Sequence, residues 1–369
     1  MAELSGDVVV IGAGLIGLSI AFELAQRGAA VRILDVAEPA KGASWAGAGM
    51  LAPLTEQIPD AAMQALCEKS LVLYPEYVDK IRASSNIDPK LRLDGVLSVA
   101  LDEAQVDRLD VRAAQLRAQQ HACRLYDRDE TLALEPALSA AVLGSLLVSE
   151  EGQVDNRRLG RALQEACVRE GVTLQVGVKH LSVECDTRRV LGVRTDAGFL
   201  PAGSIVNAAG AWSAQIEGVP SDCIPPVRPI KGQMLAIEVP KGFVGHASWV
   251  PGAYMVPRED GRLLVGATVE DVGFDTRVSG DGLRKLLDSV LDAAPALGSF
   301  SVSETWAGLR PGTPDERPFL GATPLGGYFL ATGHYRNGIL LAPVTARYVA
   351  DAIEGKKHST AFSIDRDNG

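Results

Sequence analysis

The sequence predicts an α/β protein in which a parallel-sheet domain is interleaved with an antiparallel β domain. Three observations predict this fold. A strand, a glycine turn, a helix and a second strand open the chain, and the same pattern returns after residue 150. Short strands separated by Gly and Pro turns fill the stretches between. The 369 residues suggest two domains, at roughly 100 to 200 residues per domain.

The first unit begins at residue 7. Val8 to Ile11 form a continuous apolar run, which is typical of a strand buried on both faces of a parallel sheet. A helix follows and ends near Gly28, because apolar side chains recur at helical spacing: Leu15, Leu18, Phe22 and Ala25. The next strand ends at Asp35.

The second unit starts at Asp155, a good N-cap for a helix that ends at Gly171. Its buried face is predicted to hold Leu159, Leu163, Ala166 and Cys167, and a strand should follow over 173–178. A hairpin with its turn near Asp196 and Gly198 comes next, and then another apolar strand in "SIVNAAGAWS".

The remaining segments complete the two domains. We expect helices over 103–120 and 282–294, antiparallel strands over much of 220–305, and a long C-terminal helix opened by Gly338. Residues 1–90, 150–215 and 306–369 are assigned to the first domain. Residues 91–149 and 216–305 are assigned to the second, substrate-binding domain.

Composition excludes several classes of function. The net charge is −10 and no basic cluster is longer than Lys356-Lys357, so the footprint of a nucleic-acid-binding protein is missing. The start "MAELSGD" lacks a basic segment, and the apolar run after it is shorter than the roughly 20 residues of a membrane helix. We therefore expect a cytoplasmic, unprocessed chain that binds no membrane.

Cysteine and histidine usage points away from disulfides and metals. The five cysteines form no CxxC pair, and an odd number cannot be fully paired within one chain. Reduced structural thiols are the expected state. The five histidines lack metal-ligand spacing such as HxxxH, so no metal site is expected.

Gly12-Ala13-Gly14-Leu15-Ile16-Gly17 matches GxGxxG between a strand and a helix. The first glycine allows the turn, the second lets the backbone approach a pyrophosphate, and the third packs helix against strand. Asp35 follows where an acid can bind a ribose. This context predicts a dinucleotide but leaves NAD and FAD open.

"GASWAGAGML", from Gly42 to Leu51, favours FAD. Its small residues offer free amides and a flat surface for a phosphate and an isoalloxazine ring. A small-residue interface between packed helices is the alternative.

Six motifs carry a resemblance to a known family: the N-terminal fingerprint, "GASWAGAGM", "GQVDNRRL", "VNAAGAWS", "WAGLRPGTPDERPFLG" and "GHYRNGILLAP". In this order and spacing the chain resembles the D-amino-acid oxidase superfamily of FAD-dependent amine oxidases, and within it the glycine oxidases of thiazole (thiamine) biosynthesis. The similarity covers essentially the whole chain, and the last two motifs are the most specific. The fold implied is a GxGxxG-type, Rossmann-like FAD domain interleaved with an antiparallel substrate domain.

The resemblance implies an FAD cofactor. Attachment should be noncovalent, because a covalent link would use a cysteine in the C-terminal third and the last one is Cys223. Two groups of residues are the implied FAD contacts. The first is Gly12, Gly14, Leu15, Ile16, Gly17, Asp35, Ala43, Ser44, Ala48, Gly49, Met50 and Val178 (near the adenine), and the second is the turn of His334, Tyr335, Arg336, Asn337, Gly338, Ile339 and Leu340.

The resemblance also implies three catalytic residues. Arg310 should grip the substrate carboxylate, for which its planar fork of donors is suited, and Tyr254 and Arg336 should complete the pocket. Alternatives remain for each. Arg310 could form a salt bridge to Asp315 or Glu316, Tyr254 could pack in the core, and Arg336 could merely hold its turn.

The implied activity is oxidative deamination of glycine by hydride transfer to flavin N5. The products would be an imine or 2-oxo acid, ammonia or an amine, and, with O2 as acceptor, H2O2. Departures from the family pattern at Gly252 and Val269, which can line the pocket, leave sarcosine, N-alkylglycines and small D-amino acids as further substrates. The resemblance suggests a homotetramer. Alternatives are a dehydrogenase with another electron acceptor and a non-catalytic flavin-bearing subunit.

Overall fold

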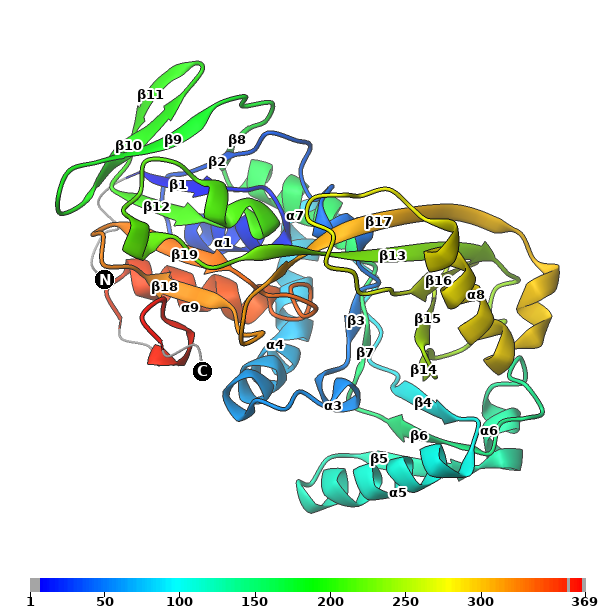
Figure 1. The fold of residues 1–369 in the computed structure, drawn as a ribbon. Helices are drawn as coiled ribbons and strands as arrows, with labels where there is room; N and C mark the ends of the chain where they lie inside the picture. Colours follow the sequence, from blue (N-terminus) through cyan, green and yellow to red (C-terminus); the bar gives the residue numbers. More distant parts are fainter. Residues whose placement is uncertain (1–6, 357–358, 367–369) are drawn as a thin grey trace.

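The computed structural model describes residues 7–356 and 359–366 (Figure 1). Within them lie a six-stranded and an eight-stranded sheet, with two smaller sheets beside them. The expectations for residues 1–6 of "MAELSGD", for Lys357 and for residues 367–369 of the first domain lie outside the described residues. In the described part of the chain, no helix combines the length and apolar character needed to cross a bilayer.

The six-stranded sheet confirms the predicted parallel core. Its order is β18-β19-β12-β1-β2-β8, and every neighbouring pair is parallel except β18 with β19. Its members are β1 (Val8–Ile11), β2 (Val31–Leu34), β8 (Thr173–Gln175), β12 (Ser204–Asn207), β18 (Phe319–Ala322) and β19 (Tyr328–Thr332). Strand β8 is shorter than the predicted 173–178, because Gly177 turns the chain with φ +74°.

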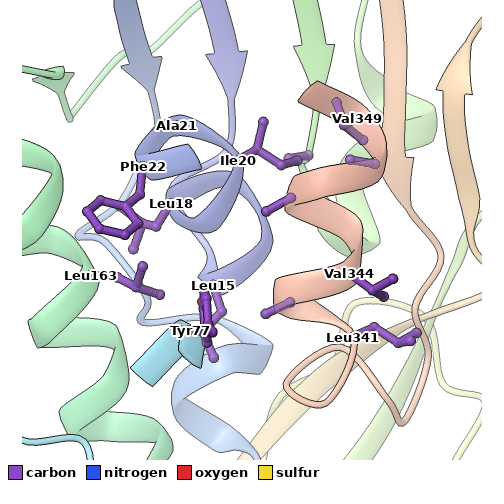
Figure 2. Close-up of a cluster of buried hydrophobic side chains, with 14 of the residues drawn as sticks. Leu15, Leu18, Ile20, Ala21, Phe22, Tyr77, Leu163, Leu341, Val344 and Val349 are labelled. Carbon is purple, nitrogen blue, oxygen red and sulfur yellow. The ribbon is translucent and has the colours of Figure 1, made fainter. Parts of the chain in front are cut away.

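Helices α1 (Leu15–Gln26), α7 (Asn156–Arg169) and α9 (Ala342–Ile353) pack against strands of this sheet, and α4 (Ala61–Ser85) packs against α7 and α9. Figure 2 shows α1 between α7 and α9, with Phe22, Leu18 and Leu163 close together. Asp155 caps α7 as predicted, accepting a hydrogen bond from the amide of Arg158 at 2.9 Å. Gly28 ends the first helix with φ +87°.

The predicted hairpin is present in a three-stranded antiparallel sheet that extends from the first region. It connects β10 to β11, with the turn where it was predicted. The strands are β9 (Leu181–Cys185), β10 (Val190–Thr195) and β11 (Gly198–Pro201).

The eight-stranded sheet forms the second region and has the order β17-β13-β16-β15-β14-β4-β6-β5. Its neighbours are antiparallel except β14 with β4. The bounds are β4 (Val96–Ala100), β5 (Cys123–Asp127), β6 (Gly144–Val148), β13 (Arg228–Glu238), β14 (Ala247–Val250), β15 (Ala253–Pro257), β16 (Arg262–Gly266) and β17 (Val302–Gly312).

Strands β13 and β17 reach from the second region to the first (Figure 1). Residues 306–312, which the sequence assigned to the first domain, therefore pair within the sheet of the second. The rest of the domain division stays a prediction.

Shorter elements connect the two regions and cover the second sheet. The predicted helices 103–120 and 282–294 appear as α5 (Glu103–Ala118) and α8 (Gly280–Ala293). The others are α2 (Ala43–Ala46), α3 (Pro53–Glu56), α6 (Arg128–Leu134), β3 (Met50–Leu51) and β7 (Gly152–Gln153), with 3₁₀ turns η1 (Gly210–Gln215), η2 (Ser221–Cys223), η3 (Pro295–Ser299) and η4 (Thr360–Phe362). All five cysteines are unpaired thiols, as predicted.

Packing between α1 and α7 contributes to the stability of the first region. Leu163 is fully buried against α1 (Figure 2), so Leu163→Ala should lower the free energy of unfolding by about 2 to 5 kcal/mol. Urea unfolding measures this change. The control is Leu191→Ala, because Leu191 is 46% exposed and its truncation should cost about 0.5 kcal/mol or less. Equal losses in the two variants would contradict the assignment.

Candidate flavin and substrate site

Residues far apart in the sequence line one cavity of about 410 Å³. The glycine turn, α2 and the turn before α9 form one side, and β13, β15 and β17 form the other. Most of the predicted site residues meet here: Gly14, Leu15, Ile16, Ala43, Ser44, Ala48, Gly49, Met50, Tyr254, Arg310, His334, Tyr335, Arg336, Asn337, Gly338 and Ile339.

Two predicted residues, Gly12 and Gly17, lie behind the wall and shape it. Gly12 has φ +107°, and a Cβ atom there would lie 2.4 Å from the carbonyl oxygen of Ala208. A Cβ atom on Gly17 would lie 1.9 Å from the carbonyl oxygen of Gly12. These contacts match the turn and packing roles predicted for both glycines.

Asp35, Val178 and Leu340 are also outside the cavity wall. The Asp35 carboxylate accepts hydrogen bonds from the amides of Ala13, at 2.6 Å, and Ala37, at 2.9 Å, so it fixes the glycine turn. The amide of Val178 donates to the backbone oxygen of Asp35 at 3.1 Å, which places these two residues side by side. Leu340 is buried in the core. Their contacts with ribose, adenine and flavin stay predictions.

The N-terminus of α1 opens into the cavity. The N-cap residue, Gly14, has no side chain to cap the helix. The hydroxyl of Ser44 instead accepts a hydrogen bond from the amide of Leu15 at 2.9 Å. A helix end with free amides attracts an anion. The wall beside it has only small side chains, in the stretch 46–49, and a Cβ on Gly47 would lie 2.7 Å from the Cδ1 of Ile339. This cradle fits a pyrophosphate and a flat ring.

The turn of residues 334–341 closes the other side of the cavity. The sequence predicted that Gly338 opens the last helix, but α9 begins at Ala342. Pro343 lies in the first turn of α9, a position that suits proline and favours a helix start there. The amides of residues 338–340 have no backbone partner among the described residues, so they remain free to donate to a ligand.

Helix α4 holds this turn in place. The hydroxyl of Ser70 donates to the carbonyl oxygen of Leu340 at 2.6 Å, and the hydroxyl of Tyr74 donates to the carbonyl oxygen of Ile339 at 2.8 Å. Both carbonyl oxygens therefore point toward α4.

Arg310 presents its guanidinium to the cavity without a carboxylate partner. Its Nη1 donates to the backbone oxygens of Thr268, at 3.1 Å, and Lys231, at 3.4 Å. Within residues 7–356 and 359–366 no acid lies within salt-bridge distance of it, and Asp315 is instead paired with Arg366. The alternative of a salt bridge to Asp315 or Glu316 is therefore wrong.

A glycine makes room for this guanidinium. Gly232 lies on β13 beside Arg310, and a Cβ atom there would be 2.3 Å from Nη1 and 2.6 Å from Cζ. Any other residue at position 232 would push the guanidinium away.

Tyr254 lies on β15 and faces the same cavity. Its hydroxyl is 3.8 Å from the Sδ of Met234, and burial raises the pKa of Tyr254 above its usual value, although Arg310 opposes the rise. The phenol is therefore protonated at neutral pH and can donate a hydrogen bond. The alternative of a purely structural core aromatic does not describe a side chain that lines the cavity.

Arg336 and Glu56 also line the cavity. The guanidinium of Arg336 stacks on the ring of Tyr335 at 5.2 Å and has no carboxylate within 4.0 Å among the described residues. Burial raises the pKa of Glu56, and the charge of Arg336 and a hydrogen bond from Asn337 oppose this. Glu56 was missed in the sequence, where it follows the apolar stretch "LAPL" without any motif around it.

Trp249 was also missed. It faces Tyr254 across β14 and β15, with ring centroids 5.3 Å apart, and both rings line the cavity. Its indole Nε1 is buried and has no partner among the described residues. The only sequence signal was its position on the strand before Tyr254.

The two departures from the family pattern have different outcomes. Gly252 lines the cavity, has φ +84° and forms the turn between β14 and β15. Val269 is 51% exposed and is not part of the wall, so its predicted place in the pocket is wrong. Strand β16 ends at Gly266, and the chain after it runs along β13 instead.

The chain is similar to known proteins over most of its length. Residues 7–352 match the family described as DAO, FAD dependent oxidoreductase. The chain belongs to the FAD-dependent oxidoreductase (DAO) family. The N-terminus of α1, the small-residue wall and the free amides of 338–340 fit FAD, the cofactor of this family.

Relatives extend the similarity over the whole chain. It is 38% identical to the bifunctional protein ThiO/ThiG of Synechocystis sp., over 99% of this chain and 54% of that protein, so the chain spans about half the length of this relative. It is 34% identical to the glycine oxidase of Pseudomonas aeruginosa, over 96% of each chain. The crystal structure of glycine oxidase from Geobacillus kaustophilus is 32% identical and covers 99% of both chains, with a TM-score of 0.92.

His334 gives this FAD-dependent oxidoreductase a buried neutral imidazole. Its Nε2 is 3.0 Å from the hydroxyl of Thr345, and burial lowers the pKa of His334 to about 3. The unfolded chain takes up this proton near the ordinary pKa of 6.5, whereas the folded protein does not. Stability is therefore lost as the pH falls from 6.5 toward 3.

The variant His334→Gln should remove this dependence, since glutamine can still reach a hydroxyl but does not titrate. Between pH 7 and pH 5 the wild type should lose about 2 kcal/mol of unfolding free energy more than the variant. Urea unfolding at both pH values measures the difference. Parallel losses in the two proteins would show that His334 is protonated in the folded state.

Proposed function

We propose that this chain is an oxidase of glycine, with sarcosine, small N-alkylglycines and small D-amino acids as further substrates. The products are an imine or 2-oxo acid, ammonia or an amine, and H2O2. The observation that carries the proposal is the Arg310 guanidinium, which faces a family-typical flavin cavity without a carboxylate of its own. The similarity of this chain to two glycine oxidases over nearly its full length supports the same activity.

Arg310 would hold the substrate carboxylate. A guanidinium presents two parallel N–H donors that match a carboxylate, and each charge-assisted hydrogen bond contributes about 1.5 to 3 kcal/mol. The protonated hydroxyl of Tyr254 would add a third donor. These groups fix one end of the amino acid, which orients its Cα within the cavity.

The same cations would help the substrate amine to lose its proton. A positive charge disfavours a second positive charge nearby, so Arg310 and Arg336 lower the pKa of a bound ammonium group. Glu56 lies beside Arg336 and can take up a proton. The amine would then be neutral when its Cα–H bond breaks.

FAD would supply the acceptor for the two electrons and the hydrogen that leave Cα, and O2 would be the final electron acceptor. FAD would be bound noncovalently by the N-terminus of α1, Ser44, the small-residue wall and the amides of residues 338–340. The cavity wall carries Tyr254, Trp249 and Met234 on the substrate side, which favours amino acids with little or no side chain.

The biological setting is also a proposal. One relative combines ThiO with ThiG in a single chain, so we propose that the imine serves thiazole formation in thiamine biosynthesis. The cytoplasm is the proposed compartment, because five free thiols suit a reducing environment. The proposed assembly is a homotetramer, which light scattering can measure.

The activity is tested with the purified protein. It should be yellow, release its flavin on acid precipitation, and consume O2 with glycine in an oxygen electrode. Sarcosine, D-alanine and D-proline define the range of substrates, and ethylamine, which lacks a carboxylate, should be inactive. A colourless protein that binds NAD, or a flavoprotein that consumes no O2 with any of these acids, would refute the proposal.

The carboxylate role is tested with Arg310→Lys. A lysine keeps the charge but loses the fork of donors, so kcat/KM for glycine should fall about tenfold to hundredfold while the FAD content is unchanged. The matched control is Arg277→Lys, because the Arg277 side chain is exposed and forms an ion pair with Asp275. If Arg310→Lys and the control both keep wild-type kinetics, the carboxylate binds elsewhere.

A further inference from the structure

A second cavity, of about 560 Å³, lies on the other side of α2 from the flavin cavity. Trp45 of α2 faces this second cavity, whereas Ser44 and Ala46 face the first. In the described part of the chain the two cavities share no lining residue. The second one is therefore a separate site, and nothing in the proposed reaction uses it.

The lining of this cavity is strongly basic, in a chain whose net charge is −10. Nine Lys or Arg residues face three Asp or Glu residues. The three acids are already engaged: Glu259 pairs with Lys90, Asp260 pairs with Arg262, and Asp155 caps α7.

Four of the cations have no carboxylate within 4.0 Å among the residues that the structure describes: Arg158, Arg161, Lys241 and Arg258. Arg161 and Lys241 are exposed at the rim. Like charges gathered in a concave surface repel one another, and they attract an anion that neutralises them.

The floor of the cavity contains one unsatisfied polar group, in the side chain of Gln153. Gln153 is 2% exposed, and its Oε1 accepts a hydrogen bond from the Nη1 of Arg258 at 2.6 Å. Its Nε2 is buried without any partner among the described residues. Because the Oε1 of Gln153 already accepts from Arg258, its Nε2 is a donor that can bind an acceptor from a ligand.

Arg258 adds a buried charge to this floor. It is 8% exposed, and its acceptors among the described residues are neutral: Gln153, the backbone oxygen of Ala48 and the Oδ1 of Asn156. Burial lowers the pKa of Arg258 to about 10, and the charge of Asp155 opposes this fall, so Arg258 is charged at neutral pH. A buried cation whose hydrogen-bond partners are neutral is stabilised further by an additional anion nearby.

We propose that this basic cavity binds a small phosphate-bearing molecule, with Gln153 and Arg258 at its floor and Arg161 and Lys241 at its rim. Arginine forks and amide donors are suited to phosphate oxygens. The hollow shape and volume are those of a small-molecule site, which typically measures about 300 to 1,000 Å³. A protein partner would need no such buried donor.

The test is calorimetric titration of the FAD-saturated protein with inorganic pyrophosphate, at low ionic strength and without divalent metal. FAD saturation keeps the probe out of the flavin site. We expect one saturable site per chain, which weakens as salt is added because the charges are screened. Absence of saturable binding would overturn the proposal, and so would binding of polyglutamate in the absence of pyrophosphate binding.

Variants locate the site. The double variant Arg161→Ala/Lys241→Ala should weaken pyrophosphate binding about tenfold, since it removes two rim cations. The matched control, Arg108→Ala/Lys285→Ala, removes the same charge from exposed positions elsewhere and should bind like the wild type. Equal affinity of both double variants would overturn the assignment to this cavity.

A third variant tests the floor. Gln153→Glu keeps the oxygen that accepts from Arg258 but replaces the free N–H with a carboxylate oxygen. It should abolish pyrophosphate binding while the protein remains folded and loaded with FAD, as its visible absorbance and urea unfolding will report. Wild-type affinity in a folded Gln153→Glu protein would show that the amide does not contact the ligand.

Discussion

The close pairing of β13 with β17 is the constraint on which the flavin and substrate site depends. Gly232 and Gly308 lie opposite each other in this pair. A Cβ on Gly308 would lie 2.4 Å from the Cβ of Ala46, and a Cβ on Gly232 would overlap the guanidinium of Arg310. The two missing side chains therefore allow α2 to pack on one glycine and a cation to lie on the other.

Ion pairing elsewhere keeps Arg310 available. Asp315, five residues along the chain, is held by the buried Arg366 through two hydrogen bonds of 2.8 and 2.9 Å. Arg366 lies near the C-terminus, so a residue distant in sequence pairs with the acid that is nearest to Arg310 in sequence. A carboxylate brought by a ligand is then the natural partner for Arg310.

Local patterns predicted the parts of the fold that depend on local chemistry. The glycine turn and the Asp155 cap follow from steric and hydrogen-bonding rules that act within a few residues. The start of α9 was predicted four residues too early. Side chains of α4 hold the turn at 338–341 through hydrogen bonds to its carbonyl oxygens, and the local sequence gives no sign of these bonds. Long-range contacts decided that boundary.

The same distinction applies to the site. Arg310 and Tyr254 were found because they lie in motifs, whereas Glu56 and Trp249 reach the cavity only through the packing of α3 and β14. Val269 was misplaced because the end of β16 could not be located from residue type alone. Side chains without a motif become visible only when the tertiary structure places them.

The network of Gln153, Asn156 and Arg258 connects the two cavities. Arg258 donates to the backbone oxygen of Ala48, and the amide of Asn156 donates to the backbone oxygens of Ser44 and Trp45. These hydrogen bonds position the segment that forms the small-residue wall of the flavin cavity. An anion at the floor of the basic cavity would draw on the same Arg258 and Gln153 donors, so its binding would act directly on the backbone of that wall. The side chains of Arg258 and Asn156 therefore connect the floor of the proposed anion site with the backbone of the flavin cavity.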